Sequence, residues 1–428
     1  MIQWFVRFPW LQTLYAGGMA FLTYLFFYPF RRAYTAASFD DYSWGGIDFK
    51  IWMITAQVLG FAVSKGLGRK VVAELLPHQR SWRLIQIAVI SWLMYGGFAL
   101  VPAPYNLVFV FLASLPLGWV YGIMLGFLEG RKSTEILVAT LTASFILGSG
   151  FAKSVGTWVM EAWGISSTAM PFVASSLVLL PFSLGAWSLG KVPLPTLEDE
   201  ANRSPRQPMN EVDRKRFIQD FGWALITFVI SYVLLTTFRE FRDNFLPEIW
   251  KVVGTPTDAG IFTRLEVPTA VGVLLLMISL RMISSHIQAF RVIQSLMVLG
   301  GLTLIGTTWA YQQGWISPVI WLISLGVGVY VAYAMCNSLY FERLLAAFQR
   351  VGTIGFLITL ADYYAYLGSI LVLFYKHFFH QKMDYLPFFQ GMSYGIGALY
   401  LTLVLVSWVY LERKYRREVK SIAKNPTY

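Results

Sequence analysis

The chain alternates long apolar runs with short polar stretches along its whole length. Twelve such runs can be drawn, at residues 10–38, 50–67, 84–103, 106–128, 135–160, 169–189, 218–240, 260–280, 292–312, 317–341, 352–378 and 387–411. A helix needs about 20 mostly apolar residues to cross a bilayer, so each run predicts one transmembrane helix. The pattern therefore predicts an all-α integral membrane protein with twelve transmembrane helices.

One polar segment interrupts this pattern near the midpoint of the chain. It lies between the sixth and seventh runs and reads KVPLPTLEDEANRSPRQPMNEVDRKRFIQD. Proline and charge at this density indicate a linker outside the bilayer. We expect a six-helix bundle at residues 1–190, a cytoplasmic linker at 191–217, and a second six-helix bundle with a basic cytoplasmic tail at 218–428.

The first and seventh runs share a short sequence pattern. YLFFYPFRRAY (24–34) aligns with YVLLTTFREFR (232–242), so that a tyrosine, a phenylalanine and an arginine recur 208 residues apart. An offset close to half the chain is what two related six-helix halves require. Parallel repeats of this kind occur in one large class of transporters, whose binding site lies between the two halves.

Composition and charge agree with a membrane protein. The chain is 56% hydrophobic and 13% charged, with a mean hydropathy of +0.56, and this is too little charge to cover a soluble protein of its size. The net charge of +11 does not indicate nucleic acid, because the basic residues lie in short loops between the runs. Most of the basic residues fall on the same side of the membrane as the two chain termini. Only a few, such as Lys50 and Arg242, fall in loops on the opposite side. This bias predicts cytoplasmic N- and C-termini in the cell inner membrane.

Charged residues within the runs are the candidates for function. A lysine, arginine or aspartate in mid-helix costs about 2.5–3.5 kcal/mol, and such residues usually face the bundle interior or a watery cavity. Arg31 and Arg239 lie at matching places in the repeat and could converge on one cavity, where guanidinium groups would bind a phosphate or carboxylate. The alternative is that both extend to the membrane interface or pair with a nearby carboxylate. The carboxylates in reach are Asp40, Asp41, Glu240 and Asp243.

Each of four further charged residues allows two interpretations. Lys65 is either a flanking interfacial lysine or part of the site, and Lys153 lies among small residues that permit close helix packing or leave room for a substrate. Glu266 could accept a coupling proton or neutralise an arginine, Arg239 or Arg264. Asp362 could carry a proton if burial raised its pKa, or accept hydrogen bonds from tyrosines.

The sequence contains no catalytic or metal-binding motif. Cys336 is the single cysteine, which excludes a disulfide framework and a cysteine-rich metal site. There is no phosphate-binding loop, no serine elbow and no zinc-binding histidine pair. We therefore expect neither an enzyme nor a bound cofactor or metal.

Short motifs in the first half resemble those of a known family. The stretch YPFRRAY (28–34) resembles the helix 1 pattern of the organophosphate:phosphate antiporters of the major facilitator superfamily, with Arg31 on the phosphate-binding arginine and Arg32 on the basic residue beside it. The stretch QVLGFAVSKG (57–66) resembles the helix 2 pattern, in which a Ser-Lys pair, here Ser64 and Lys65, follows a glutamine, here Gln57.

The second half carries matching motifs. FREFRDNFLPEIW (238–250) resembles the helix 7 pattern and places Arg239 on the second phosphate arginine. TRLEVPTAVG (263–272) is similar to the start of helix 8 in sugar-phosphate members, with Glu266 on their glutamate. Helix 5 has no histidine where glycerol-phosphate carriers have one, and Lys153 is the nearest charge there.

The resemblance implies a major facilitator fold of two pseudo-symmetric six-helix bundles. It implies a secondary active transporter that works by alternating access on a small anionic, in particular phosphorylated, organic solute held between Arg31 and Arg239. We expect the rest of the substrate site to comprise Arg32, Lys65, Lys153, Tyr28 and Gln57. Coupling would be phosphate exchange, or proton symport through Glu266 or Asp362.

Two alternatives fit the same residues. One is a proton-coupled carrier of a carboxylate or a peptide-like solute. The other is a receptor or scaffold that has the same fold and does not transport. In each case the partners are a small solute or protein and the lipid bilayer, with no nucleic acid, and a monomer is compatible with the sequence.

Overall fold

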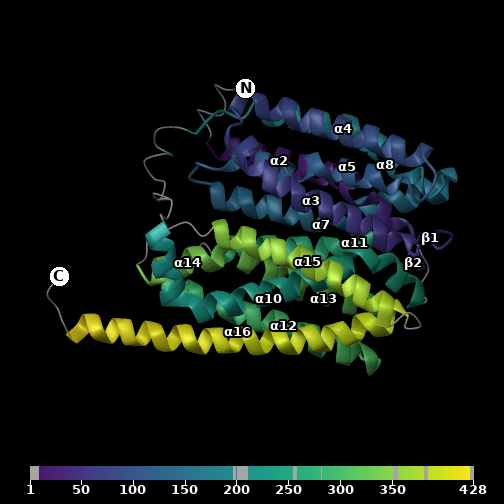
Figure 1. The fold of residues 1–428 in the computed structure, drawn as a ribbon. Helices are drawn as coiled ribbons and strands as arrows, with labels where there is room; N and C mark the ends of the chain where they lie inside the picture. The colour runs from purple at the N-terminus through teal and green to yellow at the C-terminus, as the bar shows by residue number, and fades with distance from the viewer. Residues whose placement is uncertain are drawn as a thin grey trace. The chain divides into compact units, whose positions relative to one another are not determined.

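The computed structural model describes residues 9–195, 199, 211–253, 258–280, 282–349, 355–379 and 384–424, which are almost entirely helical (Figure 1). In chain order the elements are α2 (Pro9–Arg32), η1 (Ala33–Ala36), β1 (Ser43–Trp44), β2 (Ile47–Asp48), α3 (Phe49–Ala73), η2 (Pro77–Gln79), α4 (Arg80–Leu100), α5 (Leu107–Leu117), α6 (Val120–Leu128), α7 (Thr134–Trp163), α8 (Met170–Leu189), α10 (Glu211–Val252), α11 (Ile261–Leu280), α12 (His286–Gln312), α13 (Pro318–Ala334), η3 (Met335–Leu339), α14 (Tyr340–Ala347), α15 (Gly355–Phe379) and α16 (Tyr385–Lys424). The strands β1 and β2 form one antiparallel pair between α2 and α3. The prediction of an all-α protein is confirmed.

Eight helical segments in the described part of the chain are long and apolar enough to cross a membrane. They correspond to the predicted runs other than 10–38, 50–67, 317–341 and 352–378. These four runs also fold as helices, namely α2, α3, α13 and α15. Of these, α13 is a shorter apolar helix of 17 residues that gives way to a π-helical turn.

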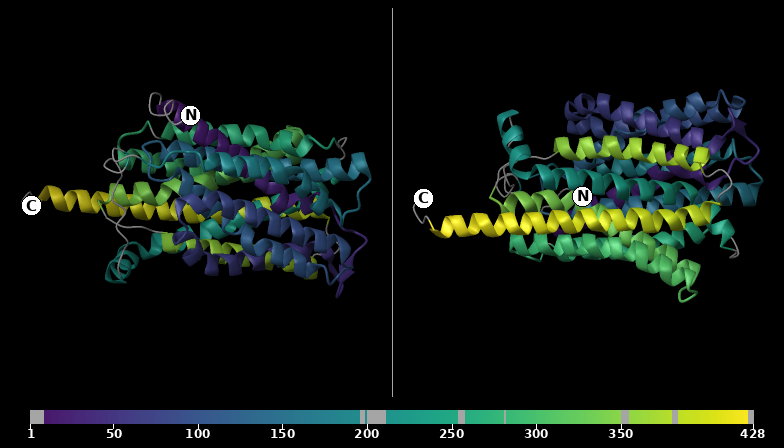
Figure 2. Two further views of the ribbon diagram at one scale, coloured as in Figure 1. Left: turned by 90° about the horizontal axis from the view of Figure 1, so that it is seen from above. Right: turned by 60° about the horizontal axis from the view of Figure 1, so that its bottom comes forward.

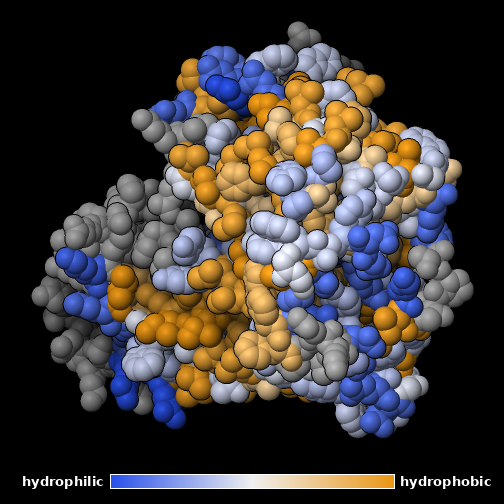
Figure 3. All heavy atoms as spheres, turned by 45° about the vertical axis from the view of Figure 1, so that its right-hand side comes forward, coloured by the Kyte–Doolittle hydropathy of each residue, from blue (hydrophilic) through white to orange (hydrophobic). Residues whose placement is uncertain are grey.

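The surface is that of a protein that contacts lipid. Many large apolar side chains are exposed, including Leu100 and Met282 at 86% each. Figure 3 shows wide areas of apolar side chains on the face that it draws. Water-soluble monomers rarely expose apolar surface of this extent, so the chain is an integral membrane protein.

The chain forms two compact units that do not follow its order. Unit 1 comprises Met1–Arg203, Asp243–Ser279 and Leu373–Leu386, and unit 2 comprises Ser204–Arg242, Leu280–Val372 and Pro387–Tyr428. The end of α10, the predicted eighth run up to Ser279, the end of α15 and the start of α16 thus pack with the first half of the chain. The division into bundles at 1–190 and 218–428 stays a prediction.

Unit 1 is built around α2 and α7. The helix α2 packs against α7 and α8, while α4 packs against α5 and α8, and these helices run beside one another in Figure 1. Glycines on α7 allow the close approach: a side chain at Gly148 would strike the ring of Tyr28, and one at Gly150 would strike Phe262 on α11. Small residues therefore determine how α7 packs, as they do in many membrane helix pairs.

Unit 2 packs by the same rule. The helix α12 lies against α13, where the backbones of Gly300 and Gly328 approach so closely that neither position has room for a side chain. The start of α13 is capped by Ser317, whose hydroxyl accepts a hydrogen bond from the backbone N–H of Ile320 at 3.3 Å. Pro318 follows the cap, where a proline leaves no donor unsatisfied.

Candidate functional site

Arg31 lies at the C-terminal end of α2, against an aromatic wall. Its guanidinium carbon is 4.7 Å from the ring centre of Phe61 and 5.8 Å from that of Tyr28. Tyr28 is 5% exposed and Phe61 is 6% exposed. Both rings present a face to the cation and orient its planar donors, which is a favourable interaction in a poorly hydrated site.

Gln57 orients the end of α2. Its amide nitrogen donates to the backbone carbonyl of Arg31, and its amide oxygen accepts a hydrogen bond from the hydroxyl of Tyr34 at 2.9 Å. The last carbonyls of a helix have no intrahelical partner, so this contact satisfies one of them. The structure places the amide of Gln57 beside Arg31, and its predicted contact with substrate stays a prediction.

Arg32 points in another direction from its neighbour. It is 2% exposed and donates through Nη1 to the side-chain oxygen of Asn244 on α10. Lys65 lies in the second half of α3 and is half-buried. The structure thus places Arg31, Tyr28, Gln57 and Arg32 around the end of α2, within unit 1.

Lys153 and Glu266 are both completely buried in unit 1, on α7 and α11. The ammonium group of Lys153 donates to the hydroxyl of Ser149 at 2.7 Å and to its backbone carbonyl at 3.2 Å. These helices are joined by Ser154, whose hydroxyl accepts hydrogen bonds from the N–H and the hydroxyl of Thr263. The packing at Gly150 brings Glu266 against α7.

The second arginine, Arg239, lies in unit 2 on α10. It is 7% exposed, its Nη2 donates to the carboxylate of Glu240 at 2.7 Å, and its guanidinium carbon is 4.2 Å from the ring centre of Tyr333. Pairing with a nearby carboxylate was one of the two interpretations, and for Arg239 it is confirmed. The hydroxyl of Tyr232 donates to Asp362 at 2.6 Å, and it lies in hydrogen-bond contact with the hydroxyl of Tyr333 at 3.1 Å. Asp362 therefore does accept a tyrosine hydrogen bond, as the second interpretation of that residue proposed.

The two units repeat one local arrangement. In unit 1 Tyr24 on α2 contacts Tyr121 on α6, with ring centres 6.0 Å apart. In unit 2 the repeat partner of Tyr24 is Tyr232, which contacts Tyr333 with ring centres 5.4 Å apart. Each unit also holds its repeat arginine over an aromatic ring. The tyrosine pairs give the weak sequence repeat a structural counterpart, whereas the rings beside Arg31 and Arg239 lie on α3 and α13, so the equivalence of the two arginines stays a prediction.

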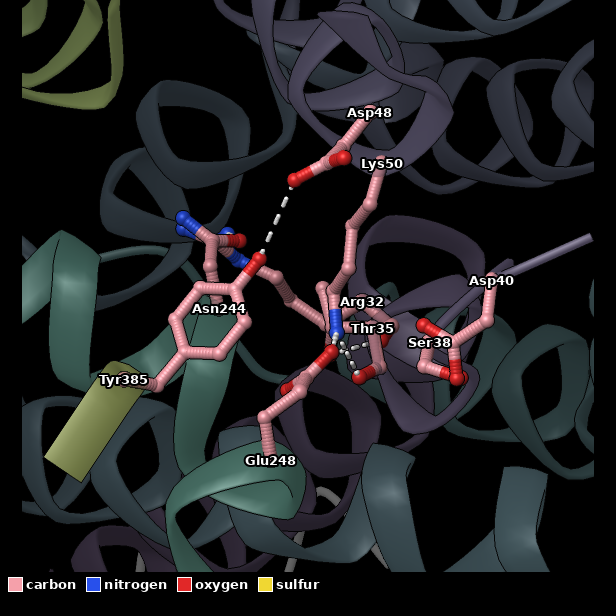
Figure 4. Close-up of polar contacts among 9 residues, drawn as sticks. All are labelled: Arg32, Thr35, Ser38, Asp40, Asp48, Lys50, Asn244, Glu248 and Tyr385. Carbon is pink, nitrogen blue, oxygen red and sulfur yellow. Dashed lines mark hydrogen bonds and ion pairs between the residues drawn. The ribbon is translucent and has the colours of Figure 1, made fainter. Parts of the chain in front are cut away.

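A buried polar network that sequence reasoning missed lies near the β1–β2 pair (Figure 4). Lys50 at the start of α3 is 2% exposed, forms an ion pair with Glu248 on α10, and donates to the backbone carbonyl of Thr35 at 2.9 Å. Asp48 accepts a hydrogen bond from Tyr385 at 3.4 Å. Contacts from the first half, from α10 and from α16 meet here within unit 1.

The placement of Lys50 and Arg242 in loops was wrong. Both are buried in helices, and Nη2 of Arg242 donates to the backbone carbonyl of Leu322 at 3.3 Å. Each charge flanks an apolar run, and a flanking charge looks the same in sequence whether it faces water or a partner. Lys50 and Glu248 carry opposite charges and lie at the same predicted membrane face. This is the sequence signal that could have identified the pair.

An exposed ion pair marks the start of α11. Asp258 and Arg264 are in contact there, with side chains 56% and 68% exposed. A hydrogen bond from the backbone N–H of Gly260 lowers the pKa of Asp258 below its ordinary value, and Arg264 lowers it further. Arg264 was one of the two arginines considered as partners for Glu266, and it pairs with Asp258.

Among the residues that the structure describes, no three His, Cys, Asp or Glu side chains gather as a metal ion would require. The fold is that of an all-α integral membrane protein, and each of its two units holds an arginine over an aromatic ring. The chain belongs to a family of unknown function, DUF5690, whose model matches residues 33–414. No curated protein matches the chain.

Proposed function

We propose that this protein is a secondary active transporter of the twelve-helix major facilitator type. Its solute is a small organic anion, with phosphate esters as the first class to test, and it works in the cell inner membrane with both termini in the cytoplasm. Phosphate exchange or proton coupling would drive it. The resemblance of YPFRRAY and FREFRDNFLPEIW to organophosphate antiporters is one support for this proposal.

One observation carries the proposal: each arginine of the sequence repeat, the half-buried Arg31 and the buried Arg239, is held over an aromatic ring. The guanidinium carbon of Arg31 lies 4.7 Å from the ring centre of Phe61, and that of Arg239 lies 4.2 Å from the ring centre of Tyr333. A guanidinium within an apolar run is costly, and a scaffold has no need for two of them. A ring beneath the guanidinium fixes its plane, which suits bidentate binding of phosphate or carboxylate.

Alternating access also needs contacts that close one side of the protein and later open. We assign this role to the ion pair of Lys50 and Glu248, which joins the first half of the chain to the second. Its support is that Asp243–Ser279 and Leu373–Leu386 pack in one compact unit with the first half. In the closed state the pair and its neighbours would exclude water on the outer side.

The experiment is exchange of radiolabelled inorganic phosphate into proteoliposomes that are preloaded with phosphate. Wild type should exchange, and Arg31→Ala and Arg239→Ala should each lower the rate at least tenfold. A hydrogen bond to a charged group contributes about 1.5–3 kcal/mol, and 1.4 kcal/mol is a factor of ten. Arg31→Lys keeps the charge without the planar fork and should give an intermediate rate.

The matched control is Arg264→Ala, which removes an arginine of the same chain whose side chain is 68% exposed. It should leave exchange unchanged. If Arg31→Ala exchanges at the wild-type rate while remaining folded, the site assignment is wrong. If folded wild type does not exchange phosphate, phosphate antiport is wrong and the carboxylate carrier becomes the better hypothesis.

A proton-coupled carboxylate carrier is the second candidate, and one contact favours it. The half-buried carboxylate of Asp362 accepts a 2.6 Å hydrogen bond from Tyr232, and Tyr232 reaches Tyr333 beneath Arg239. Protonation of this carboxylate would be communicated to the arginine through two phenols. In that case Asp362→Asn should abolish uptake driven by a pH gradient and leave solute exchange without a gradient intact.

A further inference from the structure

The last helix continues far beyond its apolar part. The helix α16 runs unbroken from Tyr385 to Lys424, and Figures 1 and 2 show it extending past the other helices of unit 2 toward the C-terminus. Its last buried apolar residue in the described part is Leu411, which is 1% exposed. The segment that follows carries Arg413, Lys414, Arg416, Arg417, Lys420 and Lys424.

Contacts on one side fix the rotation of this segment. Glu412 accepts two hydrogen bonds from Arg291 on α12, at 2.7 and 3.1 Å. The ammonium group of Lys414 donates to the backbone carbonyl of Asp220 at 2.6 Å, and Tyr415 packs against Phe348. Because these residues face the unit, the opposite side of the helix must face away from it.

The remaining basic residues lie on that opposite side. Residues 413, 417, 420 and 424 follow one another at spacings of four, three and four, which places them on one helix face. Arg413 and Arg417 are exposed, and Arg416 beside them has a side chain 72% exposed. Of the two acids nearby, Glu412 is shared between Arg291 and Arg416, whose Nε donates to it at 3.0 Å, and Glu418 lies 3.8 Å from Lys414. We call the residues Arg413, Arg416 and Arg417 the basic stripe.

We propose that the basic stripe binds the headgroups of anionic phospholipids where α16 leaves the bilayer. At 1.5 Å per residue, Arg413, Arg416 and Arg417 lie within about 10 Å of Leu411 along the helix axis. That distance covers the headgroup layer and is close to one Debye length at physiological salt.

Lipid fits this stripe better than a soluble polyanion for a geometric reason. The stripe begins two residues after the last buried apolar residue, so its first arginines are held beside the membrane surface by the helix itself. Clusters of basic residues directly after a transmembrane helix bind anionic lipid. The inference does not depend on transport and holds for a scaffold of the same fold.

The test compares full-length protein in detergent with added phosphatidylglycerol or phosphatidylcholine, followed by native mass spectrometry of retained lipid. Wild type should retain phosphatidylglycerol selectively, and the selectivity should fall as salt rises. The variant Arg413→Gln/Arg417→Gln removes two exposed charges with no contact to the core. Each basic residue near a surface contributes about fivefold, so the affinity should fall about 25-fold.

The matched control is Arg83→Gln/Lys132→Gln, which removes the same charge from exposed positions on other segments. This control should retain wild-type selectivity. Equal selectivity in the stripe variant and wild type would overturn the proposal, and so would equal loss in the control. Retention of a single-stranded oligonucleotide without preference between the two lipids would also overturn it, in favour of a soluble polyanion.

Discussion

The ion pair of Lys50 and Glu248 allows a prediction whose size follows from burial. Lys50 is 2% exposed and Glu248 is 12% exposed, so neither charge has much water around it. Removing one partner leaves the other charge buried and uncompensated, which typically costs about 3–5 kcal/mol. Lys50→Met keeps the length of the side chain and should destabilise the protein by an amount in this range.

A double-mutant cycle separates the pair from its surroundings. Glu248→Gln should cost a similar amount, while the double variant Lys50→Met/Glu248→Gln should recover a large part of the loss, because no charge then stays buried alone. The carbonyl of Thr35 loses its 2.9 Å donor in both lysine variants, so recovery will be incomplete. The measurement is reversible chemical unfolding of the purified protein in detergent.

The exposed ion pair of Arg264 and Asp258 lies in the same unit and provides a comparison. Arg264→Ala breaks an ion pair whose side chains are 68% and 56% exposed, and it should change the free energy of unfolding very little. If Lys50→Met were as mild as Arg264→Ala, burial would not be the source of the effect. Single-variant losses that simply add in the double variant would equally contradict a direct interaction.

The same variants test the assigned gating role. The single native cysteine, Cys336, is buried, so a cysteine introduced at Thr35 would report access to the network. A membrane-impermeant thiol reagent should label this cysteine faster in the Lys50→Met background than in the Arg264→Ala background. Equal labelling rates in the two backgrounds would remove the gating role and leave a purely structural ion pair.

Two further predictions concern packing and pH. Gly148→Ala should destabilise the protein by about 1–3 kcal/mol, because the new methyl group would strike the ring of Tyr28. Gly18 has open space around it, so Gly18→Ala should be neutral or slightly stabilising. An unfolding titration measures both effects. The pKa of Asp258 is lower in the folded protein than in the unfolded chain, so its stabilising contribution is complete above about pH 4 and is lost as the pH falls below that value. Asp258→Asn should remove this acid-dependent component from the unfolding curve, and an unchanged curve would contradict the assignment.

Hydrophobic patterning alone located the helices of this protein. All twelve predicted runs fold as helices, because a chain in lipid must satisfy its backbone within each segment and the apolar length needed to cross is fixed. The sequence also made Arg31 and Arg239 candidates for a binding site, since charge in an apolar run is costly wherever it faces. The structure then gave each arginine an aromatic neighbour, Phe61 and Tyr333, that no local pattern identifies.

Only the tertiary structure determined which charged residues form pairs. Lys50 pairs with Glu248, 198 residues away in the chain, and Arg32 pairs with Asn244, 212 residues away. In sequence, the helix faces that form these pairs look the same as faces that contact lipid. Hydrophobic periodicity predicts the rotation of a helix well when one side of that helix faces water. In a bilayer both sides of the helix are apolar, so its rotation depends on close packing at residues such as Gly148 and Gly150. The sequence therefore determined where each membrane helix lies along the chain, and packing determined the rotation of each helix and so the partners of its buried charges.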